Sequence, residues 1–263
     1  MQRISAFPSV FGATVLAFLM LPILAVVPAS FNDASFIKIP PSSYSFRWYH
    51  AFLNDYAWMN AVSVSFQVAV ITTVISVIVG TMAALGLERM RSAWRGLFRA
   101  VLLAPMIVPV IMTSVALYYV MRRVGLQGNT MGLALGHTLL SLPFVVLNVG
   151  VSIAKFDQSL ARAAAGLGAS PLMIFRTITF PMIKPGIAAG AAFAFITSFD
   201  EAVLSLFLSG PGTVTLPIKL WQEIRIEFTP VSAVAATAIL IVTIVVFLAS
   251  NAHKLRRDNT KWR

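Results

Sequence analysis

Two adjacent carboxylates, Asp200 and Glu201, lie in an otherwise apolar stretch that starts at Pro185. About 15 residues separate the pair from Pro185, and at 1.5 Å of rise per helical residue this is roughly 22 Å along the span. Charged side chains inside an apolar span are costly, and they usually face a cavity or a partner. Because carboxylates can compensate a cation stripped of water, we predict a cation pathway at Asp200 and Glu201, with Ser198 and Phe199 beside them. A structural ion pair with another helix or subunit, or an interfacial position, is the alternative.

Other kinds of reactive site find no support in the sequence. Cysteine is absent, which excludes disulfides, thiolate metal sites and cysteine nucleophiles. His50, His137 and His253 are too scattered for a metal site, and neither an H-E-x-x-H nor a G-x-S-x-G motif occurs. A G-x-x-x-x-G-K-[ST] phosphate loop is also missing. We therefore expect no enzyme, no metal and no bound nucleotide, and we assign each histidine a local polar role.

Composition indicates a membrane protein. Of the 263 residues, 58% are hydrophobic and 11% are charged, whereas soluble domains carry roughly 25% charged residues. A membrane-crossing helix needs about 20 apolar residues, and six stretches approximately qualify: Val10–Phe31, Asn60–Leu87, Leu97–Met121, Met131–Ile153, Pro185–Leu208 and Val231–Ser250. We expect an all-α membrane protein with six transmembrane helices in one domain, residues 1–263. The first run could be a signal peptide, but it exceeds the usual apolar length of about 7–15 residues.

The basic residues predict the orientation of the spans. Most of them fall on one side: Arg3, Arg89, Arg91, Arg95, Arg99, Lys155, Arg162, Arg176, Lys184, Lys254, Arg256, Arg257, Lys261 and Arg263. By the positive-inside rule this side is cytoplasmic, so both termini of this multi-pass chain are predicted to face the cytoplasm. The net charge of +11 then reflects membrane insertion and anionic lipid, and nucleic acid is not an expected partner.

Prolines and glycines suggest how the spans bend and pack. Prolines that should kink or interrupt a helix occur at Pro22, Pro105, Pro109 and Pro143. Small residues four apart, which let helices approach closely, occur as Gly132 with Gly136 and as Gly186 with Gly190. Before the second span, aromatic and apolar residues recur at helical spacing at Phe46, Tyr49, Phe52, Leu53 and Tyr56. They predict a short interfacial helix or a contact surface for an external partner.

The loop 154–184 has more structure than a simple connection needs. An alanine-rich helix is expected from Asp157 to Gly166, and Gly168 should stop it, because glycine tolerates the left-handed conformation. Ser170 and Pro171 read as an N-cap followed by proline at the first helical position. A second short helix should then run to about Thr179 and end at Pro181. The pattern predicts two helices joined by a hinge, which suits a docking surface; a surface loop without a partner is the alternative.

This loop resembles the EAA loop of permeases of ABC importers. The family pattern is Glu-Ala-Ala, three residues, Gly, nine residues, Ile, one residue, Leu-Pro, and it is matched at Ala163, Ala164, Gly168, Ile178 and Pro181. Two positions depart, since Arg162 replaces the glutamate and Phe180 replaces the leucine. The resemblance implies a type I ABC-importer permease fold whose loop forms a cytoplasmic coupling helix in a cleft of the ATPase subunit. The coupling residues implied are Arg162, Ala163, Ala164, Gly168, Ala169, Ser170, Pro171, Ile178 and Pro181.

Further residues resemble the spermidine/putrescine branch of these permeases. They are Phe46-Arg47-Trp48-Tyr49, Ser198-Phe199-Asp200-Glu201, Ser209-Gly210-Pro211-Gly212 and Thr215-Leu216-Pro217-Ile218-Lys219. The resemblance implies an inner-membrane location and three partners: a second permease subunit in a heterodimer, a dimer of ATPase subunits that carries ATP and Mg, and a periplasmic or extracellular substrate-binding protein. Relatives also carry other small amines, opines, thiamine or ferric iron. A stand-alone secondary transporter, in which the acid pair carries protons, is a separate class.

Overall fold

The computed structural model describes residues 6–37, 39–155, 157–226 and 229–258. The chain divides into two compact units. Met1–Asn60 and Lys219–Val242 form the first, and Ala61–Ile218 and Thr243–Arg263 form the second. Each unit is described by itself below, and the second contains both the loop 154–184 and the acid pair.

Helices form nearly all of the regular structure in the described residues, where the one β-type pairing is a bridge between Asn32 and Tyr44. The helices are α1 (Ala6–Ala29), α2 (Arg47–Asn54), α3 (Tyr56–Arg89), α4 (Ser92–Leu103), η1 (Ala104–Met106), α5 (Val110–Arg123), α6 (Thr130–Ala154), α7 (Gln158–Gly166), α8 (Pro171–Ile174), η2 (Phe175–Thr179), α9 (Phe180–Phe199), α10 (Val203–Leu208), α11 (Leu216–Ile226) and α12 (Pro230–Asp258). The fold class is therefore all-α, as predicted.

Five helical runs among the described residues are long and apolar enough to cross a membrane, and a bent pair brings the number to six. The pair consists of Ala93–Met106 and Val110–Arg123, which meet at an angle of 97°. Pro105 lies in the 3₁₀ turn at this bend and Pro109 is the N-cap of α5. The predicted interruption at these two prolines is confirmed, because each removes a backbone donor where the chain changes direction.

Two other expectations about helix continuity were wrong. Pro22 and Pro143 lie inside α1 and α6, which continue through them. The fifth span was predicted to run unbroken to Leu208, but α9 ends at Phe199 and α10 begins at Val203. Neither glycine nor proline marks this break in the sequence, which explains why an apolar run was read as one helix.

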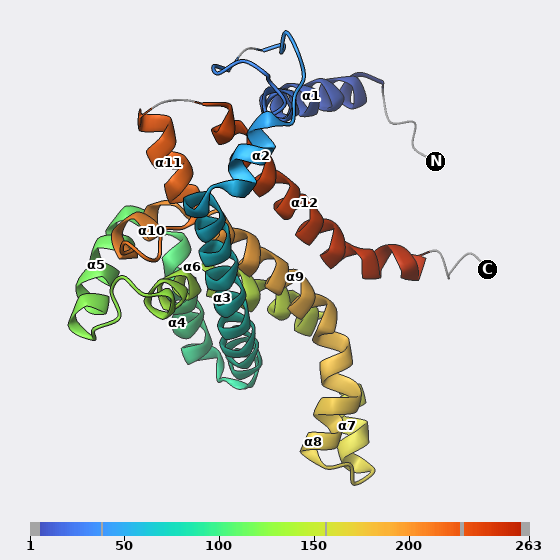
Figure 1. Cartoon of the computed structure of the whole chain (residues 1–263). Helices are drawn as coiled ribbons and strands as arrows, with labels where there is room; N and C mark the ends of the chain where they lie inside the picture. Colours follow the sequence, from blue (N-terminus) through green and yellow to red (C-terminus); the bar gives the residue numbers. More distant parts are fainter. Residues whose placement is uncertain (1–5, 38, 156, 227–228, 259–263) are drawn as a thin grey trace. The chain divides into compact units, whose positions relative to one another are not determined.

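Close packing of α6 against α9 forms the centre of the second unit, where the two helices run side by side (Figure 1). A Cβ atom added at Gly190 would lie 2.9 Å from the Cα atom of Val145, and one added at Gly186 would overlap Ser152. Gly136 faces the Leu204 and Leu208 side chains of α10 in the same manner. The predicted role is confirmed for Gly186 and Gly190, which meet backbone atoms of α6, whereas Gly136 meets flexible leucine side-chain ends and Gly132 meets the loop backbone at Leu126.

The first unit contains the aromatic segment before α3. The predicted short helix is present as α2, where Phe52 is buried and its ring centroid lies 5.4 Å from that of Trp58. Tyr49 stacks at a tilt on Phe31, at 5.0 Å between centroids, and its hydroxyl lies 2.7 Å from the hydroxyl of Ser30. These contacts tie α2 to the end of α1 within this unit.

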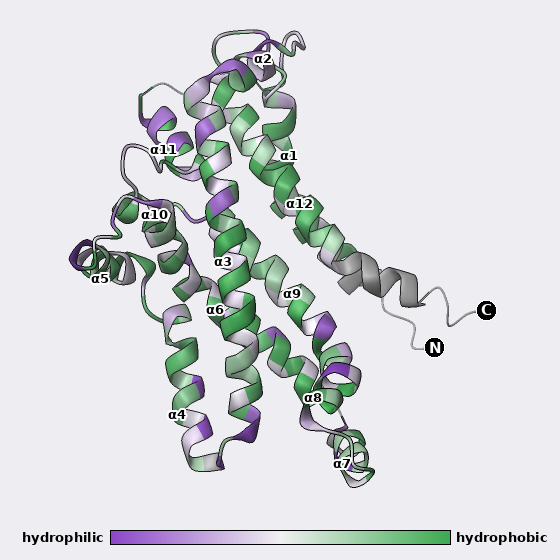
Figure 2. Cartoon of the chain, turned by 60° about the horizontal axis from the view of Figure 1, so that its bottom comes forward, coloured by the Kyte–Doolittle hydropathy of each residue, from purple (hydrophilic) through white to green (hydrophobic). Residues whose placement is uncertain are grey.

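Polar residues gather at one end of the second unit. Figure 2 shows apolar colouring along most of α3, α6 and α9, and hydrophilic residues at the turn between α3 and α4 and around α7 and α8. One cavity is lined by Glu88 and Arg89, at the end of α3, and by Arg162 of α7. The two hydrophilic regions therefore lie at the same end of the second unit. This distribution agrees with the predicted concentration of basic residues on one side.

We predict that Gly190→Ala destabilises the protein by roughly 1–3 kcal/mol, because the added methyl group forces α9 away from the backbone of α6. Gly150→Ala is the matched control, since it changes a glycine of α6 that has open space around it. Thermal unfolding of the detergent-solubilised protein should show a midpoint lowered by several degrees for the first variant. Equal midpoints for the two variants would contradict the packing argument.

Candidate functional site

The predicted first helix of the loop 154–184 is present as α7, and a side chain caps its start. Asp157 is the N-cap of α7, and its carboxylate accepts a hydrogen bond of 2.9 Å from the N–H of Ser159. This hydrogen bond holds the pKa of Asp157 below its ordinary value. The cap therefore stabilises α7 above the ordinary aspartate pKa, and its contribution is lost as the pH falls through the lowered pKa.

Gly168 ends α7 in the left-handed conformation, with φ of +84°. Its N–H donates to the carbonyl of Ala165 and the N–H of Ala169 donates to the carbonyl of Ala164, both at 3.0 Å. These two bonds define the Schellman motif, which satisfies the last carbonyls of a helix. The predicted hinge is therefore present, and its hydrogen-bond acceptors come from the alanines that precede it.

The second helix of the loop begins as predicted but does not end as predicted. Ser170 is the N-cap of α8, its hydroxyl accepts from the N–H of Met173 at 3.3 Å, and Pro171 occupies the first turn. The expectation that Pro181 terminates this helix was wrong. From α8 the chain continues through the π-helical turn η2 into α9, and Pro181 lies in the first turn of α9.

The π-helical turn explains how the helix passes through Pro181. In an ordinary α-helix the proline ring meets the carbonyl four residues earlier. Here the N–H of Phe180 donates to the carbonyl of Phe175, five residues earlier, so the turn is wider. The result is one helical run of 29 residues, Pro171–Phe199. The loop 154–184 is thus joined directly to the span that ends beside the acid pair.

Apolar side chains project from this loop into solvent. Leu167, at the hinge, is 90% exposed, and Leu172 and Met173 of α8 are 65% and 56% exposed. Arg162 and Ala163 of α7 are also exposed, while Ile178 is half-buried in η2. An apolar cluster of this kind, flanked by polar residues, is typical of a surface that a partner covers.

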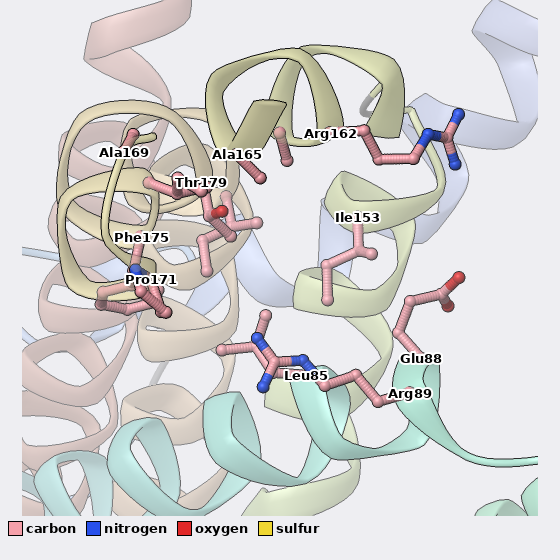
Figure 3. A pocket seen from close by; sticks show the side chains of 13 residues that line it. Leu85, Glu88, Arg89, Ile153, Arg162, Ala165, Ala169, Pro171, Phe175 and Thr179 are labelled. Carbon is pink, nitrogen blue, oxygen red and sulfur yellow. The ribbon is translucent and has the colours of Figure 1, made fainter. Parts of the chain in front are cut away.

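A cavity of about 410 Å³ separates this loop from the ends of α3 and α6. Figure 3 shows Leu85 and Arg89 of α3 on one side, Ile153 of α6 next to them, and Phe175 opposite. The guanidinium group of Arg162 points away from this cavity (Figure 3). Arg162 therefore lines the cavity with the part of its side chain near the backbone and places its charge on the outer surface of the loop.

The acid pair lies in the break between α9 and α10. Asp200 is exposed, and no hydrogen bond or ion pair to its carboxylate is found in the part of the chain that the structure describes. Glu201 differs, because its Oε1 atom accepts a hydrogen bond of 2.9 Å from the N–H of Leu204 at the start of α10. The two neighbours thus have different surroundings: Glu201 caps a helix, and Asp200 presents an uncompensated charge.

The two residues before the pair do not reach the surface. Phe199 is 3% exposed and Ser198 is 4% exposed. The ring of Phe199 stacks on that of Phe195 at 5.7 Å, and the Ser198 hydroxyl lies 2.9 Å from Nδ1 of His137. In this conformation Asp200 and Glu201 are the members of the predicted pathway set that contact solvent. Ser198, which precedes the pair, contacts His137, the histidine for which the sequence predicted only a local polar role.

A glycine contact holds the segment that follows α10. The N–H of Gly128 donates to the carbonyl of Leu208 at 3.0 Å, and the hydroxyl of Thr213 donates to the carbonyl of Gly128 at 3.2 Å. A Cβ atom at Gly210 would lie 2.9 Å from the Cα atom of Gly128, which has φ of +76°. The Ser209–Gly212 motif therefore has a structural explanation: it lets two loops of the second unit touch through their backbones.

Within the described residues, no group of three or more histidine, aspartate or glutamate side chains is arranged to hold a metal ion. Two features of the predicted sites are thus present in the structure: carboxylates at the break between α9 and α10, and a helix that continues from the loop 154–184 into α9.

Comparison with known proteins identifies the family. Residues 76–257 match the family described as binding-protein-dependent transport system inner membrane component. The spermidine/putrescine transport system permease protein PotC of Escherichia coli K12 is 30% identical over 251 residues, which cover 95% of this chain and 94% of the relative. The putrescine transport system permease protein PotI of the same strain is 34% identical over 241 residues, with 88% and 85% covered.

A solved structure supports the fold independently. The bacterial alginate ABC transporter, in complex with its alginate pentasaccharide-bound periplasmic protein, contains a chain that superposes with a TM-score of 0.72 at 14% identity, covering 97% of this chain and 96% of that one. At this identity the likeness shows the fold alone. Together with the family match, it shows that the chain belongs to the inner-membrane permease components of binding-protein-dependent ABC importers.

Proposed function

We propose that this chain is a permease subunit that imports polyamines, the substrates named for its relatives PotC and PotI. The observation that carries the proposal is the exposed, unpartnered carboxylate of Asp200 at a helix break inside a membrane protein. An amine cation that leaves water needs such a counter-charge. A neutral or anionic solute would gain nothing from it.

ATP is proposed to act through separate ATPase subunits. The chain carries no phosphate-binding loop, and the exposed apolar residues Leu167, Leu172 and Met173 provide a surface for a partner. The rigid run Pro171–Phe199 then links this surface to the residue before Asp200. A displacement of the loop 154–184 by the ATPase would therefore move the substrate site without an intervening flexible joint.

The remaining partners and the orientation belong to the same proposal. A second permease subunit would complete the pathway, and an external binding protein would deliver the substrate, as the periplasmic protein does in the alginate transporter complex. Both termini and the loop 154–184 are proposed to face the cytoplasm, in agreement with the positive-inside rule. We treat the whole chain as one transmembrane permease domain.

The proposal is tested with the complete complex, purified through a tag on this chain and reconstituted with its binding protein in vesicles. We expect ATP-dependent accumulation of labelled spermidine or putrescine, and none of a neutral sugar of similar size. Accumulation by this chain alone under a proton gradient would instead establish a secondary transporter.

The acid pair supplies a second prediction. Asp200→Asn removes the uncompensated charge and should raise the KM for amine uptake by roughly tenfold, equivalent to about 1.4 kcal/mol. Asp33→Asn, which removes an exposed carboxylate of the segment before α2, serves as the control for net charge. An unchanged KM in the Asp200 variant would show that the carboxylate has no part in substrate binding.

The hinge supplies a third prediction. Gly168→Val forces a β-branched residue into positive φ, which strains the backbone, and it should abolish ATP-driven uptake while leaving membrane insertion intact. Gly166→Val is the matched control, because both glycines have open space around them and Gly168 is the one with positive φ. Uptake is measured per assembled complex. Equal loss in both variants would mean that surface bulk, and not the hinge conformation, is what matters.

A further inference from the structure

The break between α9 and α10 leaves backbone groups without helical partners. The last carbonyls of a helix and the first N–H groups of the next have no intrahelical bond, and in a membrane each such group is costly unless protein or water satisfies it. The N–H of Leu204 is satisfied by the side chain of Glu201. Ser198, one residue before the end of α9, is contacted by a polar side chain of a different helix.

That partner is His137 of α6, which is 1% exposed. Its Nδ1 atom lies 3.1 Å from the carbonyl oxygen of Ser198 and 2.9 Å from the Ser198 hydroxyl. Its Nε2 atom lies 2.9 Å from the hydroxyl of Ser205. Ser198 belongs to α9 and Ser205 belongs to α10, so one imidazole ring contacts both sides of the break.

Both ring nitrogens have a hydrogen-bond partner. With the proton on Nδ1 the ring donates to Ser198 and accepts from the Ser205 hydroxyl, and with the proton on Nε2 it accepts from the Ser198 hydroxyl and donates to Ser205, so either tautomer joins the two flanks. An imidazolium in this buried site would need a counter-ion, and none of the contacts to His137 supplies one. The ring is therefore neutral, and it hydrogen-bonds to Ser198 on one side of the break and to Ser205 on the other.

We propose that His137 is a positioning residue for the substrate site: it clamps α9 to α10 across their break and so fixes the place of Asp200. Asp200 has no side-chain partner of its own in the described residues, so its position is set by the backbone on either side. His137 is the side chain that contacts both of those flanks. The inference rests on the proposed function only for the identity of the ligand that Asp200 binds. The contacts of His137 with both helices do not depend on that ligand.

Apolar side chains pack closely around the His137 ring, and this packing limits the movement of α9 and α10 on either side of the break. Leu204 and Leu208 of α10 are fully buried and pack with Leu133 of α6, one turn before His137. Gly136, next to His137, brings the Leu204 and Leu208 side chains close to the α6 backbone. The apolar contacts bring the two helices together, and the hydrogen bonds of His137 determine their register.

The test uses the absence of native cysteine from this chain. Asp200→Cys introduces a single thiol at the break, and its rate of reaction with a membrane-impermeant maleimide is measured in the complete complex, resolved on this chain. We expect His137→Leu to change that rate by roughly fivefold or more, the factor expected for about one lost hydrogen bond. His137→Gln, which keeps one donor and one acceptor, should give an intermediate rate.

Ser141→Ala is the matched control. Ser141 is buried one turn further along α6, and its hydroxyl donates to the carbonyl of Ala194 in α9 at 3.3 Å, away from the break. It should leave the labelling rate unchanged. If Ser141→Ala and His137→Leu change the rate equally, or if neither changes it, His137 is an ordinary core residue and the inference is overturned.

Uptake separates this inference from the proposed function. With Asp200 present, His137→Leu should raise the KM for amine about fivefold with a smaller effect on the maximal rate, because the counter-charge is displaced and not removed. A further outcome separates the two claims. If His137→Leu changes the labelling rate but neither His137→Leu nor Asp200→Asn changes the KM, the clamp is established and the role of Asp200 in amine binding is refuted.

Discussion

A polypeptide can interrupt a helix inside a membrane only where other groups satisfy the freed backbone atoms. The break between α9 and α10 meets this requirement with two side chains. Glu201 accepts from the N–H of Leu204 in the first turn of α10, and His137 hydrogen-bonds to Ser198 at the end of α9. Because these bonds hold the break open, Asp200 can face solvent at a point where an uninterrupted helix would place it on an apolar span. The carboxylate and its exposure thus depend on an imidazole from another helix.

The loop 154–184 solves the same physical problem by local means. Its helix ends are capped by Asp157 and Ser170, and its hinge at Gly168 is closed by bonds to the two preceding alanine carbonyls. Every partner lies within five residues in the chain. The loop can therefore keep its shape while it moves as a whole, which suits a part that transmits force from a separate subunit.

The continuous helix through Pro181 connects these two regions. A regular α-helix would have kinked there, and the π-helical turn at η2 avoids this by shifting the hydrogen bonds to residues five apart. The glycines at 186 and 190 then hold the run against α6 at backbone distance. Since α6 also carries His137, the helix that receives motion from the loop and the helix that fixes the break are packed directly on each other.

The sequence by itself determined the class of protein, the apolar stretches, the two capped helices and hinge of the loop 154–184 and, through the resemblance of that loop, the family, because apolar length, caps and a glycine of positive φ are local properties. It indicated Asp200 and Glu201 as unusual, since charge in an apolar run is visible in one dimension. Only the tertiary structure decided that α9 stops at Phe199, that Pro181 does not end its helix, and that Glu201 is a cap while the Asp200 carboxylate has no partner among the described residues. The end of α9 involves a partner far along the chain, His137, which is 61 residues from Ser198, and no spacing rule in the sequence encodes such a contact. The other two outcomes rest on local hydrogen bonds, from Phe180 to Phe175 and from Leu204 to Glu201, which the residue pattern did not signal.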